Sequence, residues 1–378
     1  MQLMAIVGAS GQEGAVAEYV TSQLRKAGVP ASAITTDNAN KKSPLKGQTG
    51  NLICKLPGSL PGKRRLLMAH LDTVPLCQGC RPVLKGDYVA SADPTTGLGA
   101  DDRAGVAVVL GAALEIVRRN LPHPPLTFFW PVQEEVGLHG SQFAQLSQLG
   151  KPQLAFNWDG GPAEKLTVGA TGAYRLRIEI KGLAAHAGLA PEQGVSAIAV
   201  AGLAIAQLHK EGWHGDVRKG RRRGTSNIGY IHGGEATNVV TDRVELRAEA
   251  RSHDPELRLQ IAQAIENAFQ KAARDVKSSL GGHGEVRVTS RLDYESFRLK
   301  DDEPCLIAAE AAVRSLGLEP LKAVTNGGLD ANWMTARGIP TVTMGCGQQN
   351  VHTISERLDV AAFHQACRIA LRLATAAE

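Results

Sequence analysis

The sequence contains no apolar run of the roughly 20 residues that a membrane-spanning helix needs. Residues 1–7 lack the basic start and the long apolar core of a secretory signal peptide. The six cysteines are scattered along the chain without the spacing of a disulfide framework, which favours a reducing compartment. There is no internal repeat and no low-complexity segment. These absences predict a cytoplasmic protein without a membrane partner.

A strong excess of one charge is also missing. The net charge is +5 over 378 residues, which is too mild to indicate a nucleic-acid partner. A hydrophobic content of 43% and a charged content of 21% are typical of a globular protein. Residues 214–223 form a basic stretch that ends in Arg221, Arg222 and Arg223. We interpret it as a solvated loop, with binding of an anionic substrate as the alternative.

A complete dinucleotide-binding loop is absent as well. Residues 8–14 resemble the pattern G-x-G-x-x-G, but Ser10 stands where the second glycine is required, and no strong strand precedes the loop. Ser10 and Glu13 fit a capping box instead, which predicts an amphipathic helix from there to about Lys26. An oxidoreductase that uses a dinucleotide is therefore disfavoured.

The sequence does contain apolar strands that end in acidic or imidazole side chains. Residues 65–68 are typical of a buried strand, and His70 and Asp72 follow it. Residues two apart on a strand point the same way, so the Asp72 carboxylate can orient the His70 imidazole. Similar residues follow three other apolar strands or begin a predicted helix: Asp101, Asp102, Glu134, Glu135, Asp159 and His352.

These side chains have the composition of a metal site. Adjacent carboxylates repel one another unless cations compensate, and the strand ends of an open α/β sheet are where such sheets place their chemistry. Two imidazoles and three carboxylates suit two ions that share a bridging carboxylate, about 3.5–4 Å apart. We therefore expect two divalent ions, Zn²⁺ in preference to Co²⁺ or Mn²⁺. Cys77 and Cys80 lack the second pair that a zinc knuckle needs, and chance loop cysteines are preferred to a redox pair.

The pattern of the strands changes after Gly169. Residues 175–181 and 243–251 alternate between apolar and polar or charged side chains, as half-exposed strands of an antiparallel sheet do. Helices at 195–209 and 255–276 are expected to cover the apolar face of that sheet.

These patterns predict two domains, the number that the chain length favours. An α+β domain at residues 170–295 is inserted into the chain as a lid and dimerisation domain. Residues 1–169 and 296–378 form one discontinuous α/β domain that carries the metal site. Its sheet is expected to be mixed but mostly parallel, with helices on both faces.

Seven motifs together resemble a known family. In chain order they are His70-Leu71-Asp72-Thr73-Val74-Pro75, Gly99-Ala100-Asp101-Asp102-Arg103-Ala104-Gly105, Gln133-Glu134-Glu135-Val136-Gly137, Asp159-Gly160-Gly161, Ala185-His186-Ala187-Gly188, Ala236-Thr237-Asn238-Val239-Val240 and His352-Thr353. They resemble peptidase T-like enzymes of the dizinc superfamily that also holds carboxypeptidase G, aminoacylase and succinyl-diaminopimelate desuccinylase. The resemblance covers nearly the whole chain and implies a zinc-exopeptidase-like catalytic domain with an inserted lid.

The resemblance also implies a role for each residue of the metal site. Asp101 bridges the two ions, and the Asp101–Asp102 peptide bond is cis. One ion is completed by His70 and Asp159, and the other by Glu135 and His352. Glu134 is the general base on the bridging water and then the acid for the leaving amine. Asp72 orients His70.

The inserted domain contributes residues of its own by the same resemblance. His186 is expected to stabilise the tetrahedral oxyanion, often in the active site of a partner subunit, so a homodimer is expected. Asn238 and Arg251 match positions that contact the polar ends of the substrate. Arg251 alone is equally compatible with an ordinary solvated charge on a strand.

The resemblance implies a metal-dependent exopeptidase of short peptides, and an aminopeptidase in particular. One departure concerns Asn326, because peptidase T-like enzymes have an arginine there that can pair with a peptide carboxylate. Strict tripeptide specificity is therefore in doubt. A deacylase of N-acyl amino acids or a carboxypeptidase of the same superfamily is one alternative, and a metal-binding homologue without catalysis is another.

Overall fold

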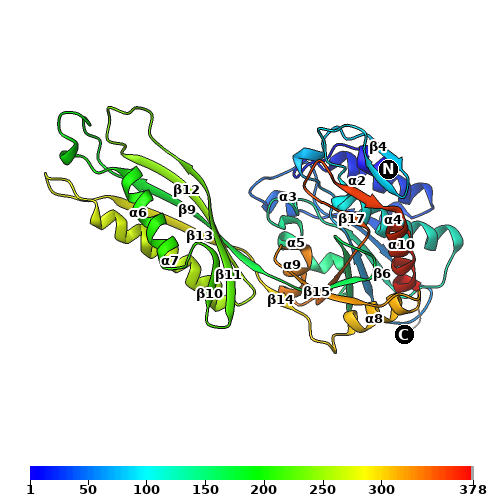
Figure 1. The fold of residues 1–378 in the computed structure, drawn as a ribbon. Coiled ribbons are helices and arrows are strands. Elements are labelled where there is room, and N and C mark those ends of the chain that lie inside the picture. The colour runs from blue at the N-terminus through cyan, green and yellow to red at the C-terminus, as the bar shows by residue number, and fades with distance from the viewer. Residues whose placement is uncertain (376–378) are drawn as a thin grey trace. The chain divides into compact units, whose positions relative to one another are not determined.

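The computed structural model describes residues 1–375, which form two compact units. The first unit contains Met1–Ala170 together with the chain from Phe297 onward, and the second contains Thr171–Ser296. Figure 1 shows both units, with the second formed by the middle of the chain. Within the described residues, no helix is long and apolar enough to cross a membrane.

The first unit is built on a nine-stranded mixed sheet in the order β1-β2-β6-β3-β7-β16-β8-β14, with β15 added beside β8. Its four central strands are parallel to one another: β6 (Leu126–Trp130), β3 (Arg65–Met68), β7 (Leu154–Trp158) and β16 (Thr341–Met344). The other strands are β1 (Ile34–Thr36), β2 (Leu52–Leu56), β8 (Lys165–Ala170), β14 (Phe297–Arg298) and β15 (Leu321–Thr325). The predicted class, a mixed α/β fold, is confirmed.

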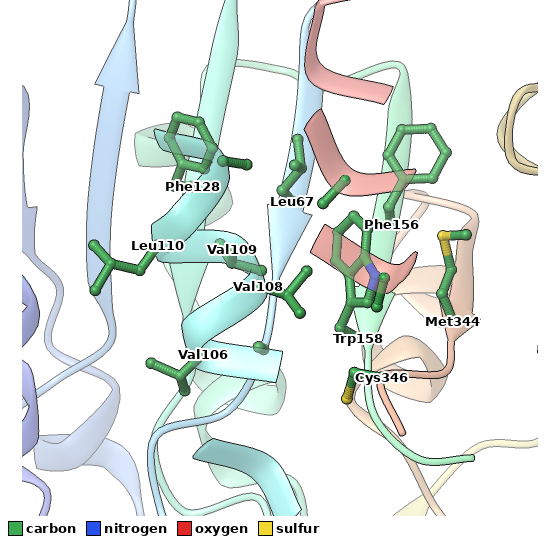
Figure 2. Packing of buried hydrophobic residues seen from close by; sticks show 14 of the residues in the cluster. Leu67, Val106, Val108, Val109, Leu110, Phe128, Phe156, Trp158, Met344 and Cys346 are labelled. Carbon is green, nitrogen blue, oxygen red and sulfur yellow. The ribbon is translucent and has the colours of Figure 1, made fainter. Parts of the chain in front are cut away.

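Helices pack on both faces of this sheet (Figure 1). Their bounds are α1 (Gln2–Ala5), α2 (Gly14–Lys26), α3 (Ala39–Lys42), α4 (Ala100–Arg119), α5 (His139–Phe143), α8 (Pro304–Arg314), α9 (Asp330–Ala336) and α10 (Val360–Thr375). Successive residues of β3 serve the two faces: Leu67 packs in the cluster with α4, whereas Leu66 and Met68 pack in the cluster with Met334 of α9. Figure 2 shows part of the first cluster, which contains Val109 of α4 and Leu67 of β3.

A smaller antiparallel sheet in the first unit has the order β17-β18-β5-β4. Its strands are β17 (Gln348–Gln349), β18 (Arg357–Asp359), β5 (Tyr88–Ser91) and β4 (Pro82–Lys85). The turn between β17 and β18 contains His352. This sheet therefore fixes the histidine that lies farthest along the chain from the rest of the predicted site.

The second unit is an antiparallel sheet in the order β10-β11-β12-β9-β13, and helices α6 and α7 share its hydrophobic core. The elements are β9 (Gly172–Lys181), α6 (Ala197–Lys210), β10 (Gly215–Lys219), β11 (Arg222–His232), β12 (Arg243–Ser252), α7 (Pro255–Asp275) and β13 (Glu285–Tyr294). The alternation seen in the sequence is explained by the pairing, because Leu176, Ile178 and Leu246 face the helices while their neighbours face solvent.

Two local predictions were wrong. The basic stretch 214–223 is not a loop, since most of it belongs to the hairpin of β10 and β11. Its charged side chains are compatible with a strand because they lie on an exposed hairpin, where Arg222 pairs with Glu256. Ser10 and Glu13 do not form a capping box either. Helix α2 begins at Gly14, and the Ser10 hydroxyl donates a hydrogen bond to Asp72.

Candidate metal centre

The parallel strands bring the predicted ligands to one edge of the large sheet. His70 follows β3, Glu134 and Glu135 follow β6, and Asp159 follows β7. Parallel neighbours end at the same edge, so side chains 60 or more residues apart in the sequence meet there. Asp101 joins them from the N-terminal end of α4, which favours negative charge. The Asp101–Asp102 peptide bond is cis, as expected.

Asp101 lies between the two imidazoles. Its Oδ1 is 3.2 Å from Nε2 of His70, and its Oδ2 is 3.3 Å from Nε2 of His352. The ligand atoms of His70, Asp101 and Asp159 lie within 4.8 Å of one another, and so do those of Asp101, Glu135 and His352. Asp101 is the residue that these two groups share. The arrangement fits two divalent ions with one bridging carboxylate, because each group supplies an imidazole nitrogen and carboxylate oxygens.

The charges of the site also fit bound cations. Burial, followed by the negative charge of Asp101, raises the pKa of Asp159 to about 7. Burial raises the pKa of Glu134 well above its usual range, and burial also raises the pKa of Glu135. Hydrogen bonds to Asp101 and Glu135 raise the pKa of His352 to about 10. Burial and neighbouring negative charges disfavour the ionised form of these carboxylates. A bound divalent cation would stabilise that ionised form.

His70 is oriented by Asp72, but through the backbone as well as the side chain. Nδ1 of His70 lies 3.1 Å from the carbonyl oxygen of Asp72 and 3.5 Å from its Oδ1. A proton on Nδ1 that is donated to this carbonyl leaves the lone pair on Nε2, the atom that faces Asp101. The Asp72 carboxylate accepts its shorter bonds elsewhere, from Ser10 Oγ at 2.6 Å and from the backbone nitrogens of Glu134 and Glu135 at 2.9 and 3.1 Å.

The backbone nitrogens of Glu134 and Glu135 therefore donate to the same buried carboxylate, but the two side chains contact different partners. Glu135 contacts Nε2 of His352 at 3.0 Å. The Oε2 atom of Glu134 lies 3.9 Å from Nε2 of His70, and the residue is buried. Glu134 forms a third group of possible ligands with His70 and Glu135, but neither of the two groups around Asp101 includes it.

Asp102, already a candidate from the sequence, completes the surroundings of the site with two residues that the sequence did not single out, Gln348 and Glu356. Asp102 is fully buried, and its carboxylate accepts bonds from the backbone nitrogens of His70 and Gly105, each at 3.1 Å. Gln348 donates to the same carboxylate at 2.8 Å, and Glu356 accepts a bond from the backbone nitrogen of Asp101 at 2.9 Å. A polar residue in a loop or in a two-residue strand, such as Glu356 or Gln348, gives no sequence signal of such a contact.

His186, Asn238 and Arg251 belong to the second unit. The structure brings the first two together, because the backbone nitrogen of Ala187 donates to the carbonyl of Asn238 at 2.9 Å. The backbone nitrogen of Gly188 donates to Nδ1 of His186 at 3.1 Å, so the neutral ring carries its proton on Nε2. Arg251 lies near the far end of β12, where its guanidinium group pairs with Glu249 at 2.9 Å.

Cys77 and Cys80 are buried free thiols. Burial raises the pKa of Cys80 to about 11, and its thiol donates to the carbonyl oxygen of Met4. Neither residue belongs to a group that could hold a metal ion within residues 1–375.

The comparisons with known proteins decide the family. The model of peptidase family M20/M25/M40 matches residues 66–376 of this chain. The chain belongs to this family. Among curated proteins, YqjE of Bacillus subtilis (strain 168) is 34% identical over 312 residues, which cover 82% of this chain and 80% of YqjE. Peptidase T of Limosilactobacillus fermentum is 27% identical over 293 residues, covering 76% of this chain and 67% of that protein.

Two solved structures superimpose on 99% of this chain. A tripeptidase from Staphylococcus aureus (Mu50) superimposes with a TM-score of 0.87 and 31% identity, covering 99% of this chain and 95% of that one. The aminopeptidase PepT from Bacillus cereus (ATCC 10987) gives a TM-score of 0.83 and 31% identity, with coverage of 99% and 96%. The chain is therefore a peptidase T-like member of the M20 family.

Proposed function

We propose that this protein is a metal-dependent aminopeptidase that hydrolyses short peptides. The observation that carries the proposal is the position of Asp101, which lies between His70 and His352 with Glu134 beside them. Related chains with the names peptidase T, tripeptidase and aminopeptidase support the substrate class. The donor set of two imidazoles and three carboxylates supports Zn²⁺, with Co²⁺ or Mn²⁺ as substitutes.

Each residue of the site has its own proposed role in hydrolysis. His70, Asp101 and Asp159 would hold one ion, and Asp101, Glu135 and His352 the other. Two bound ions would polarise the scissile carbonyl and lower the pKa of the attacking water. Glu134 accepts the proton from that water and delivers it to the nitrogen of the leaving amine. Glu134 suits this task because its carboxylate lies beside His70 and is not required to complete either of the two groups that contain Asp101.

His186 is proposed to stabilise the oxyanion that forms on the scissile carbonyl. The tautomer supports this role, because Nδ1 accepts a bond from Gly188 and Nε2–H is then the donor that the ring can offer. Asn238 is proposed to contact the substrate beside His186. Arg251 is the less favoured substrate contact, since Glu249 already engages its guanidinium group.

We also propose a homodimer and a cytoplasmic location. The dimer is supported by strand β11, because β10 pairs only with residues 222–226 of it, and β12 lies on the other side. Within the described second unit, this leaves 227–232 as an open strand edge beyond β10. Exposed Ile198 and Leu203 add apolar surface on α6. The location is supported by six cysteines that are all free.

A specific observation keeps a second function in consideration. Asn326 stands where the resemblance expects an arginine, so a partner for a free peptide carboxylate is missing. A deacylase or carboxypeptidase of the same family would use the same metal centre and a different substrate contact.

One experiment separates the two functions. A single tripeptide is offered in three forms, namely free, N-acetylated and C-amidated, with zinc, cobalt or manganese added. Cleavage of the free and amidated forms, but not of the acetylated one, is expected for an aminopeptidase without a carboxylate-binding arginine. Cleavage of the acetylated form alone would move the protein to the deacylase or carboxypeptidase group.

A further inference from the structure

Glu356 holds the loop that leads to Asp101. Its Oε2 accepts hydrogen bonds from the backbone nitrogens of Leu98 and Gly99 at 2.8 and 2.7 Å, and its Oε1 accepts one from the backbone nitrogen of Asp101 at 2.9 Å. The side chain is only 2% exposed. A buried carboxylate that accepts several backbone bonds fixes their geometry more firmly than neutral acceptors do, because charge-assisted bonds are short and strong.

Gln348 contacts the same loop. It donates hydrogen bonds to the loop, whereas Glu356 accepts them. Its Nε2 donates to the carbonyl oxygen of Ala100 at 2.9 Å and to Oδ1 of Asp102 at 2.8 Å. Gln348 is 3% exposed. Together the two side chains contact each residue from position 98 to position 102. The backbone at Asp101 cannot shift without breaking at least one of these bonds.

Gln348 and Glu356 also flank His352 in the sequence. Gln348 lies in β17, Glu356 immediately precedes β18, and the turn between them carries His352. The backbone nitrogen of Glu356 donates to the carbonyl of Thr353 at 3.2 Å, and the Thr353 hydroxyl donates to the carbonyl of Asn350 at 2.7 Å. The turn that carries His352 is thus internally bonded and is attached to the Asp101 loop at both of its ends.

We propose that Glu356 and Gln348 are positioning residues that fix Asp101 relative to His352, so that the ion shared by these two ligands meets a preformed site. The inference rests on the proposed metal-dependent function. Neither residue touches the reacting atoms, and both act through the backbone and side chains of the Asp101 loop. Partners of this kind typically change metal affinity by about 10- to 100-fold when they are removed.

The test uses Glu356→Gln and Gln348→Leu. The first variant puts an NH₂ donor against backbone N–H donors, and the second removes the amide at similar size. A matched control is Glu115→Gln, which makes the same chemical change on the exposed side of α4, where Glu115 pairs with Arg119. Each full-length protein is stripped of metal with a chelator and titrated with zinc chloride by calorimetry, and bound zinc is counted by elemental analysis.

Wild type and Glu115→Gln are expected to bind two zinc ions. Glu356→Gln and Gln348→Leu are expected to bind one of them at least about tenfold more weakly, while the metal-free variants unfold close to the wild-type temperature. Wild-type affinity for both ions in both variants would overturn the inference and leave the proposed function intact. Failure of both variants to fold would also overturn it, since the residues would then be structural. If wild type bound no zinc, the proposed function itself would fail.

Discussion

Glu134 and Glu135 are adjacent in the sequence and share Asp72 as a backbone anchor, yet their carboxylates meet different groups. Glu135 contacts His352, whereas Glu134 lies beside His70. The two residues therefore make a matched pair for separating proton transfer from metal binding, because the same substitution can be made at each.

We predict that Glu134→Gln keeps two metal ions and loses activity by about 10²- to 10⁴-fold in kcat, the usual worth of a general base. Glu135→Gln is expected to lose one ion, because Glu135 completes the group around His352. Peptide hydrolysis and metal content are measured on the same samples. Near-normal turnover by Glu134→Gln would contradict the general-base assignment.

The proposed ligands could be found from sequence because each follows a recognisable apolar strand or opens a helix. His70 and Asp159 are of this kind, and the parallel order of β3 and β7 brings them together. Glu356 could not be found in this way. It acts on a loop 255 residues away, and that contact exists only once the small sheet has formed. Long-range hydrogen bonds of loop residues leave no periodic pattern in a sequence.

Among the elements, helix α2 exists as predicted but begins differently, at Gly14. Glu13 is fully buried, and its Oε1 accepts bonds from the backbone nitrogens of Gly11 and Gln133 at 2.8 and 3.0 Å. Its Oε2 has no hydrogen-bond partner within the described residues. Burial, followed by the charge of Asp72, raises the pKa of Glu13 to about 7. Through its bond to the backbone nitrogen of Gln133, Glu13 connects the N-terminal segment to the residues that follow β6.

The raised pKa of Glu13 predicts a loss of stability as pH rises. In the window from the ordinary value of 4.5 to about 7, the folded state binds the Glu13 proton more tightly than the unfolded state does. The free energy of unfolding therefore falls as pH rises through this window, by on the order of 3 kcal/mol for this one group. Above pH 7 both states are ionised and the loss is complete.

Glu13→Gln should remove this loss. The amide oxygen can keep the two backbone bonds, and the amide nitrogen takes the place of the oxygen without a partner. The free energy of unfolding is measured with urea at pH 5, 6, 7 and 8. As pH rises, the value for wild type should fall relative to the value for Glu13→Gln. Glu18→Gln, on the same helix, serves as the control. Parallel pH curves for wild type and Glu13→Gln would contradict the prediction.

The hairpin of β10 and β11 shows what sequence patterns miss at the level of elements. Strands β9 and β12 were predictable because one face packs on α6 and α7, which imposes the alternation of apolar and charged residues. Strand β11 carries few buried side chains, so its sequence shows charge and glycine instead of alternation. Its strand conformation comes from pairing with β12 and β10, which no local pattern encodes.

At the scale of the whole molecule, the dimer and the role of His186 make a joint prediction. The proposed metal ligands belong to the first unit, and His186 belongs to the second. Suppose that His186 serves the active site of a partner subunit. A dimer with two His186→Ala chains, or with two Glu134→Gln chains, then contains no complete site and is inactive. A mixed dimer would still contain one complete site, formed by Glu134 of one subunit and His186 of the other.

Light scattering on a sizing column should therefore give the mass of two chains. The two inactive variants, His186→Ala and Glu134→Gln, are then unfolded together, refolded as an equal mixture and assayed. Random pairing makes about half of the dimers mixed, each with one working site, so about a quarter of wild-type activity is expected. A mixture that stays inactive, while refolded wild type recovers, would show that His186 acts within its own chain. A monomeric mass for wild type would exclude the shared site altogether.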